Sequence, residues 1–377
     1  MKRIAMTFVL AAVVFGSGML WAEDQVYFRE SGKKKDSVGA GTIEEESPSG
    51  IKLKTKSEGV KSIPAASISQ VEYGNKIVDK IRFRAPDGLL QKAMAETKAN
   101  KKAEQLRAAQ ISFETLDNIE QDGTKLSSIA PIHRYLQYRI AQTKALQARD
   151  DPSKRDAAIA ALMEFKTNFA DGWQIVPALQ TLASLQVDKG DVEAAGQTYS
   201  ALAEISGIAP EMKLQSQLQA SRLLLRAGKF ADAERKLTQV ETTLSANDPR
   251  RTFVSVYLIQ SRIAQNGNLD GVDKNLEEVV RKSKDNSLLA LAHNALGDFY
   301  RAKKDNERAF WEYCKVDMLY DQDKEENAKA LYYLAKLFAQ APHNNKDRAD
   351  SCRNRLLSTS FDGTLYQRLA AGEMKKE

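Results

Sequence analysis

The chain has 377 residues, which is enough for two or three domains or for one extended array of repeats. Hydrophobic residues make up 42% of the chain and charged residues 28%, a balance that excludes an intrinsically disordered protein. The formal net charge of +6 is small for this length, and basic and acidic residues are interspersed, so we expect no nucleic-acid partner.

Residues 1–22 have the pattern of a secretory signal. Lys2 and Arg3 precede an apolar run from Ile4 to Leu20, and Ala22 supplies a small residue at a cleavage point. We therefore expect cleavage after Ala22 and an exported protein, either periplasmic or secreted. Because the run is nearly long enough to span a bilayer, an uncleaved N-terminal membrane anchor is the alternative. We expect no stable membrane span after signal cleavage.

Residues 23–84 are predicted to form a small β unit. Four or five short alternating segments are separated by turns rich in glycine, serine and charge, and they begin near Gln25, Val38, Ile51, Lys61 and Ile68. This pattern favours a small antiparallel sheet or barrel, and it resembles the five-stranded barrels of the SH3-like or Sm-like type. A unit this small is marginal alone, so we expect it to pack against the first helices.

The β unit also carries many lysines, which are Lys33, Lys34, Lys35, Lys52, Lys54, Lys56 and Lys61. Such a concentration of positive charge would suit an acidic polymer or a membrane surface. The alternative is that charged edges block strand-to-strand aggregation. Three consecutive carboxylates, Glu44 to Glu46, cannot converge on one ion from a strand and are interpreted as part of a solvated turn.

The remainder of the chain, residues 85–371, has helical periodicity. The expected junction is the turn-forming sequence from Ala85 to Gly88. A helical stretch follows over 89–118, a polar loop over 121–128, and further helices over 132–148 and 156–169. Residues 372–377 are expected to be a disordered tail, preceded by a closing helix.

A helix-pair pattern recurs along the last two-thirds of the chain. Its clearest copy reads Leu296-Gly297-x2-Tyr300, then a Lys304-Asp305 turn and Ala309-x3-Tyr313. An earlier copy reads Leu182-Ala183, then Gly190-Asp191 and Ala195-x3-Tyr199. The residues that open successive second helices are spaced 34 to 40 apart, and they are Ala161, Ala195, Ala233, Val272, Ala309 and Ala349. Units that cannot bury their own apolar face must stack on their neighbours, which predicts a solenoid.

In these residues the chain resembles the tetratricopeptide repeat family, whose consensus joins Leu-Gly and Tyr in a first helix to Ala and an aromatic residue in a second. The resemblance implies a mainly α protein, an α-solenoid of about five or six helix-turn-helix repeats, preceded by the β unit. Longer helix-pair repeats of the HEAT type are the alternative, because the observed spacings exceed the usual 34 residues.

First helices line the concave face of tetratricopeptide arrays. The resemblance therefore implies that their outward residues are candidates for contact with a partner, and these are Gln180, Ser184, Arg222, Tyr257, Ser261, Asn294, Asp298, Arg301, Tyr332 and Lys336. Polar side chains mixed with tyrosine suit an extended or helical peptide. For each residue, an ordinary solvated helix position is the alternative.

The chain has two cysteines, Cys314 and Cys352, at nearly equivalent places in successive repeats. Export would place them in an oxidising compartment, where a disulfide could join adjacent second helices. Such a bridge needs Cα atoms within roughly 7 Å of each other. Two separate buried or half-buried thiols are the alternative.

No catalytic or metal-binding pattern stands out. His133, His293 and His343 lie far apart in sequence, and none has a cysteine or histidine partner at ligand spacing. We find no nucleophile motif, zinc-protease motif or phosphate-binding loop, so we expect no cofactor and no metal. An enzyme of unrecognised type is the alternative.

Together these patterns predict a non-catalytic protein-protein interaction scaffold or adaptor of the cell envelope. It would bind a partner protein or peptide in the groove of the solenoid, and the sequence names no particular partner. In the alternative, the β unit binds cell-wall polymer or another envelope component and the helices act as a spacer.

Overall fold

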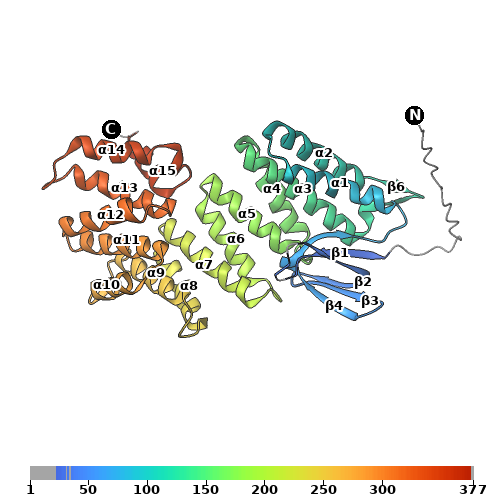
Figure 1. Cartoon of the computed structure of the whole chain (residues 1–377), viewed down its shortest axis with the longest axis horizontal. Coiled ribbons are helices and arrows are strands. Elements are labelled where there is room, and N and C mark those ends of the chain that lie inside the picture. The colour runs from blue at the N-terminus through green and yellow to red at the C-terminus, as the bar shows by residue number, and fades with distance from the viewer. Residues whose placement is uncertain (1–22, 31, 34, 375–377) are drawn as a thin grey trace, which may run out of the picture.

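The computed structural model describes residues 23–374 except residues 31 and 34. The predicted signal sequence, residues 1–22, lies outside the described residues, as do residues 375–377. A small β-sheet at one end of the described part is followed by a long row of helices (Figure 1). The predicted fold class, a mainly α solenoid with a small N-terminal antiparallel sheet, is confirmed.

The sheet contains five antiparallel strands in the order β4-β3-β2-β1-β5. Their bounds are β1 (Asp24–Phe28), β2 (Ser37–Ser47), β3 (Gly50–Thr55), β4 (Gly59–Pro64) and β5 (Ile68–Glu72). The first half of β2 pairs with β1 and its second half with β3, so this strand joins the two parts of the sheet. In β3, Ile51 and Leu53 are buried while Lys52 and Lys54 are exposed, as the alternating sequence predicts.

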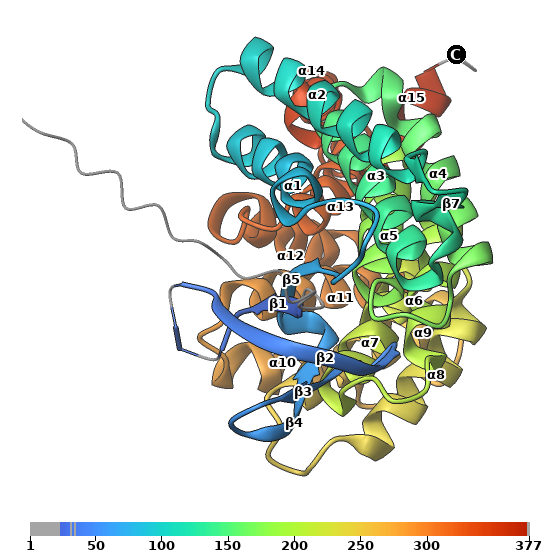
Figure 2. The same ribbon diagram turned by 90° about the vertical axis from the view of Figure 1, so that its right-hand side faces the viewer.

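The sheet packs directly against the first helices, as its small size predicts. Val26, Leu53 and Val71 belong to the same apolar core as residues of the helices that follow. The view in Figure 2 shows the sheet beside this end of the helical row. The β unit and the first helices therefore fold around a common core.

Helix α1 (Lys80–Ala95) begins earlier than the sequence indicates. Asp79 caps it by accepting a hydrogen bond from the backbone N–H of Arg82, at 2.8 Å. The expected junction from Ala85 to Gly88 was wrong, because it lies inside this helix. Pro86 and Gly88 are turn formers, but buried Asp87 is held by Tyr135 and Arg139, so tertiary contacts override the local preference.

The helices that follow α1 alternate in direction along the chain (Figure 1). They are α2 (Ala99–Asp117), α3 (Ala130–Asp150), α4 (Arg155–Asn168), α5 (Ile175–Lys189), α6 (Val192–Glu204), α7 (Pro210–Arg226), α8 (Phe230–Thr243), α9 (Arg250–Ala264), α10 (Val272–Lys282), α11 (Asn286–Ala302), α12 (Asn306–Leu319), α13 (Lys324–Phe338), α14 (Lys346–Leu356) and α15 (Leu365–Met374). A short hairpin, β6 (Glu120–Gln121) and β7 (Thr124–Lys125), occupies the expected polar loop. Apart from α15, which packs chiefly on α13, each helix packs chiefly on its sequence neighbours, which is the arrangement of a solenoid.

The C-terminal end differs from the expectation. The tail predicted to be disordered from residue 372 is helical as far as Met374, the end of α15. Gly372 costs only about 1 kcal/mol in a helix, which is too little to end α15 there. The last three residues of the predicted tail lie outside the described residues.

Two of the repeated turns between paired helices share the same two features, a left-handed residue that ends the first helix and an aspartate that caps the second. At the end of α5, Gly190 adopts a left-handed conformation with φ of 87°, and at the end of α11 Lys304 does the same with φ of 62°. The aspartate that follows each of them caps the next helix: Asp191 accepts from the N–H of Ala194 and Asp305 from that of Arg308, both at 3.1 Å. This shared chemistry explains why the two-residue turn recurs.

Gly297 of α11 lies where this helix packs closely against α12, and its replacement tests that contact. A methyl group there would lie 2.6 Å from the ring of fully buried Tyr313, whereas one at Gly196 in α6 would lie at ordinary distances of 3.6–4.0 Å. We expect Gly297→Ala to lower the free energy of unfolding by about 1–3 kcal/mol through overpacking. The matched change Gly196→Ala should raise it by about 0.5–1 kcal/mol through helix propensity.

Urea unfolding followed by circular dichroism measures both variants. Equal effects of the two substitutions would contradict the packing explanation, since the local gain in helix propensity is the same at both positions.

The apolar core of the solenoid is divided. One cluster joins the sheet to α1–α6, and another joins α8–α15, with parts of α7 packed at its border. Between them lies a small cluster in which Val192 and Ala195 of α6 meet Leu223 of α7. Helices α6 and α7 pack closely on each other, so the row of helices is continuous at this point.

Candidate functional site

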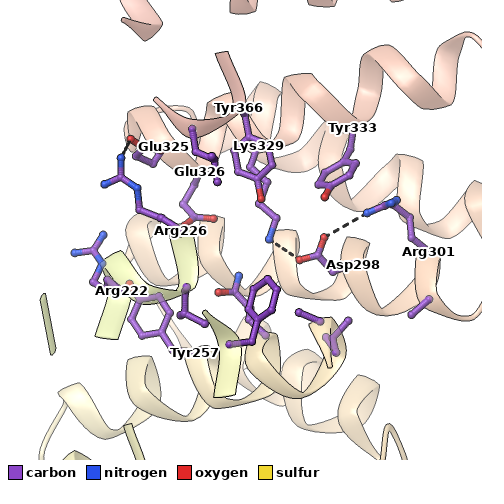
Figure 3. A pocket seen from close by; sticks show the side chains of 17 residues that line it. Arg222, Arg226, Tyr257, Asp298, Arg301, Glu325, Glu326, Lys329, Tyr333 and Tyr366 are labelled. Atoms are coloured by element: carbon purple, nitrogen blue, oxygen red, sulfur yellow. Dashed lines mark hydrogen bonds and ion pairs between the residues drawn. The ribbon is translucent and has the colours of Figure 1, made fainter. Parts of the chain in front are cut away.

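A pocket opens on the first helices of successive pairs in the C-terminal half. Its volume is about 320 Å³, and its walls come from α7, α9, α11, α13 and the closing helix α15, with Phe230 added from the start of α8 (Figure 3). Side chains of α7 and α13 meet at its edge, where Arg226 pairs with Glu325. The pocket thus lies on the face of the solenoid where the repeat pattern predicts partner contacts.

Four of the predicted contact residues line this pocket: Arg222, Tyr257, Asp298 and Arg301. They come from α7, α9 and α11, helices that are separated in sequence but adjacent in the solenoid. Gln180 lines a different, smaller depression between α5 and α7, where its Nε2 lies 3.2 Å from the sulfur of Met212. Ser184 is half-buried and lines neither pocket.

The remaining predicted residues do not face the pocket. Ser261 and Asn294 are fully buried, and Tyr332 is 7% exposed. Lys336 is exposed and donates a hydrogen bond to the Tyr332 hydroxyl at 2.6 Å. These positions serve packing or lie at the surface of the described structure.

The face of α13 that lines the pocket is rotated by one residue from the expected one. It carries Glu325, Lys329 and Tyr333, spaced four residues apart on one side of the helix. Sequence reasoning missed these three, together with Arg226, Glu326 and Tyr366. The four-residue spacing was visible in the sequence, but the rotation of α13 about its axis was not.

Asp298 is the centre of the pocket's charge network. Its carboxylate forms an ion pair with Lys329, accepts a hydrogen bond from the Tyr313 hydroxyl at 2.8 Å, and lies 3.8 Å from the guanidinium of Arg301. Burial is the largest single effect on the pKa of Lys329 and lowers it, but Asp298 acts together with Tyr366, Glu326 and Tyr333 to raise the pKa overall. Lys329 and Asp298 therefore hold α13 against α11.

A second buried contact joins the same two helices. The Nδ2 of Asn294 donates to the Glu326 carboxylate at 2.7 Å and to the Glu326 backbone carbonyl at 2.9 Å. Burial raises the pKa of Glu326. Asn294 thus positions a lining residue of the pocket without reaching the pocket itself.

Aromatic rings and arginines form the accessible part of the lining. The Arg301 guanidinium lies 3.8 Å from the centre of the Tyr333 ring, and that of Arg222 lies 5.8 Å from the Tyr257 ring. Tyr366 of α15 packs edge-on against Tyr333, with ring centres 5.8 Å apart. Stacked arginines keep their N–H edges available, and such lining suits peptide backbone, aromatic and polar side chains.

The charged groups of this pocket are engaged with one another, and among the described residues no cluster of His, Cys, Asp and Glu could hold a metal ion. The three histidines are dispersed, as their spacing predicts. His293 stacks on Tyr320 and shares a 2.6 Å hydrogen bond with Glu312, so it belongs to the helix packing.

Both cysteines are free in the structure, Cys352 buried and Cys314 half-buried. Of the two alternatives, the structure therefore shows separate thiols and no disulfide. Burial raises the pKa of each thiol to about 11, which keeps both protonated and poorly nucleophilic at neutral pH.

Five of the described lysines of the β unit are paired with carboxylates. Lys52 pairs with Glu45 at 2.6 Å, Lys54 with Glu44 at 3.2 Å and Lys56 with Glu23 at 2.6 Å. Lys33 and Lys61 both contact Glu30. This pairing agrees with the alternative that charged residues protect the edges of the sheet. Because the carboxylates offset the lysines, little net positive charge remains to attract an acidic polymer.

Across the described part of the chain, the helices are too short or too polar to cross a membrane.

The comparisons with known proteins support the helical architecture. No protein-family model and no curated protein matches the chain. A tetratricopeptide repeat protein from Parabacteroides merdae ATCC 43184 is similar in structure, with a TM-score of 0.50 and 14% sequence identity, over 76% of this chain and 99% of its own. BtubC (BKLC) from P. vanneervenii is similar over 67% of this chain and 94% of its own, with a TM-score of 0.36 and 15% identity. The first likeness bears out the predicted resemblance: the chain has a tetratricopeptide-like solenoid fold.

Proposed function

We propose that this protein is a non-catalytic scaffold of the cell envelope that binds a partner protein or peptide in the pocket between α7, α9, α11, α13 and α15. The observation that carries the proposal is the convergence of side chains from these helices, with Arg222, Arg301, Tyr333 and Tyr366 available at its surface. Arginine and tyrosine are the residue types enriched where binding energy concentrates.

The pocket favours a short segment of a partner over a large flat surface. A volume of about 320 Å³ takes a few side chains at a time, and its lining offers both rings and charged edges. An extended or helical segment with aromatic and polar side chains fits this chemistry. A non-catalytic role is supported by the ion pairs and hydrogen bonds that occupy Asp298, Lys329 and Glu326.

The envelope location rests on the signal-like pattern of residues 1–22. Cleavage after Ala22 would release the described part of the chain into the periplasm or the medium. The paired lysines of the β unit give no support to polymer binding as its main role, so we place the partner site in the solenoid.

We expect Arg301→Ala and Tyr366→Ala each to weaken partner binding at least about tenfold, because each removes part of the pocket's accessible lining. The mature protein, residues 23–377, is used to capture partners from an envelope extract, and calorimetry then compares the affinity of the captured partner for each variant. Arg281→Ala, on the exposed side of α10, is the matched control and should leave affinity unchanged.

Two results would contradict the proposal. One is a captured partner that binds Arg301→Ala and Tyr366→Ala as tightly as it binds the wild type. The other is failure of the intact protein to retain any partner from the extract.

A further inference from the structure

The first helix pair, α1 and α2, is strongly basic. Residues 80–107 contain eight basic and three acidic side chains, which gives this short segment a formal net charge of +5, whereas the whole chain of 377 residues has +6. The two helices pack on each other and lie at the N-terminal end of the helical row (Figure 1). Positive charge is therefore concentrated at one end of the molecule.

Most of these basic side chains are available to a partner. Arg84 pairs with Glu72 at 2.7 Å and Lys102 with Asp150 at 2.8 Å. Five others are exposed and form no ion pair with any described residue, and they are Arg82, Lys92, Lys98, Lys101 and Arg107. Lysines of the β unit are paired with carboxylates instead, so the free positive charge at this end lies on α1 and α2.

The exposed side of α1 combines this charge with an apolar side chain. Ile81 is 84% exposed, and the spacing of Ile81, Ala85, Gly88 and Lys92 places them along one side of the helix. A methyl group added at Gly88 would meet no atom within 4 Å, so this side is uncovered at its middle. Asp87, the only acidic residue of α1, is buried on the opposite side.

Further aliphatic side chains are exposed on the same helix pair. Met94 near the end of α1 is 61% exposed, and Ile111 of α2, one turn after Arg107, is 52% exposed. The aromatic residues of the pair, Phe83 and Phe113, are buried. Aliphatic side chains among cations suit an anionic bilayer, which accepts the former between acyl chains and the latter at its headgroups. Single-stranded nucleic acid would gain little, because its bases need aromatic rings for stacking.

We propose that α1 and α2 form a docking surface for an anionic lipid bilayer. This surface, here called the basic face, consists of Ile81, Arg82, Lys92, Met94, Lys98, Lys101 and Arg107. The protein would lie on the bilayer with Ile81 at the boundary of headgroups and acyl chains, and with the basic side chains at the lipid phosphates. The pocket belongs to α7–α15, in the other half of the row, so a docked protein would still present it to a partner (Figure 1).

Flotation with lipid vesicles tests the basic face, using the chain from residue 23 onwards. We expect the protein to float with vesicles that contain phosphatidylcholine and phosphatidylglycerol in equal amounts, and not with vesicles of phosphatidylcholine alone. Adding about 0.5 M NaCl should weaken the binding at least about ten-fold, because salt screens exposed charges. Failure to bind the anionic vesicles, or equal binding to both kinds, would overturn the inference.

A double substitution locates the charges that bind. Lys92→Gln with Lys101→Gln should weaken binding to the anionic vesicles about twenty-fold, since each basic side chain at such a surface contributes about five-fold. Lys274→Gln with Arg281→Gln is the matched control, because it removes the same charge from exposed positions of α10. Its effect should stay below about two-fold. Equal losses in the two double variants would mean that overall charge alone matters, and would refute the basic face.

Ile81→Ser distinguishes a bilayer from other acidic partners. We expect it to weaken vesicle binding at least about five-fold, because an apolar side chain no longer enters the bilayer. Met318→Ser, at a 75% exposed position of α12, is the control and should have no effect. An unchanged affinity of Ile81→Ser, or equally tight binding of a single-stranded oligonucleotide by the wild type, would assign the surface to an acidic polymer and refute bilayer docking. Arg301→Ala should bind vesicles like the wild type, so this test stands apart from the proposed pocket.

Discussion

Replacing Arg139 with methionine is expected to lower the free energy of unfolding by about 3–5 kcal/mol. Arg139 of α3 pairs with Asp87 of α1 at 3.0 Å, with side chains only 7% and 3% exposed. It also donates to the backbone carbonyl of Ser69 in β5 at 2.6 Å, so one guanidinium joins the sheet, α1 and α3. Methionine would leave the Asp87 carboxylate buried without its cation.

The measurement is urea unfolding of the chain from residue 23 onwards, followed by circular dichroism. The double change Asp87→Leu with Arg139→Met should recover much of the loss, because no uncompensated charge remains buried. Arg29→Met, which breaks an exposed pair with Asp36, should cost less than about 1 kcal/mol. If Arg139→Met lowered the free energy of unfolding no more than Arg29→Met does, the stabilising role of the buried pair would be refuted.

Replacing Lys329 with methionine should lower the free energy of unfolding by about 2–3 kcal/mol. Its ammonium is the main cation on Asp298, and the two side chains are 11% and 16% exposed. Asp298 would keep its hydrogen bond from Tyr313 and the more distant Arg301, so we expect a smaller cost than at Arg139.

Thermal and urea unfolding of Lys329→Met provide the measurement. Lys282→Met is the control, because Lys282 forms an exposed pair with Glu278 four residues earlier in α10 and should contribute less than about 0.5 kcal/mol. Equal effects at the two lysines would mean that Lys329 is not part of the support of the pocket. A larger effect at Lys329 would show that the charges lining the pocket first serve to hold its helices together.

The repeat architecture could be predicted because its signals are local. The Gly190-Asp191 and Lys304-Asp305 turns supply a left-handed residue and a helix cap in adjacent positions, which any reader of the sequence can locate. The alternation of Ile51 and Leu53 with lysines marks β3 in the same way. Each of these features depends on a few consecutive residues and on backbone geometry alone.

The candidate site was only partly predictable. Arg222, Tyr257, Asp298 and Arg301 follow from their places in the repeat, and all four line the pocket. Asn294 occupies a similar repeat position but is buried, because Glu326 of α13 packs over it. A repeat position defines which way a side chain leaves its own helix, but a neighbouring helix decides whether that side chain reaches solvent.

The sequence by itself determined the elements, the solenoid and the signal-like start. Tertiary structure alone decided where α1 begins, because buried Asp87 is held by Arg139 across the core. It also decided which face of α13 lines the pocket, and that Arg226 meets Glu325 across the groove. The physical reason is that helix rotations and superhelical turns accumulate over many packed residues. Contacts between distant repeats depend on that sum and on no single segment.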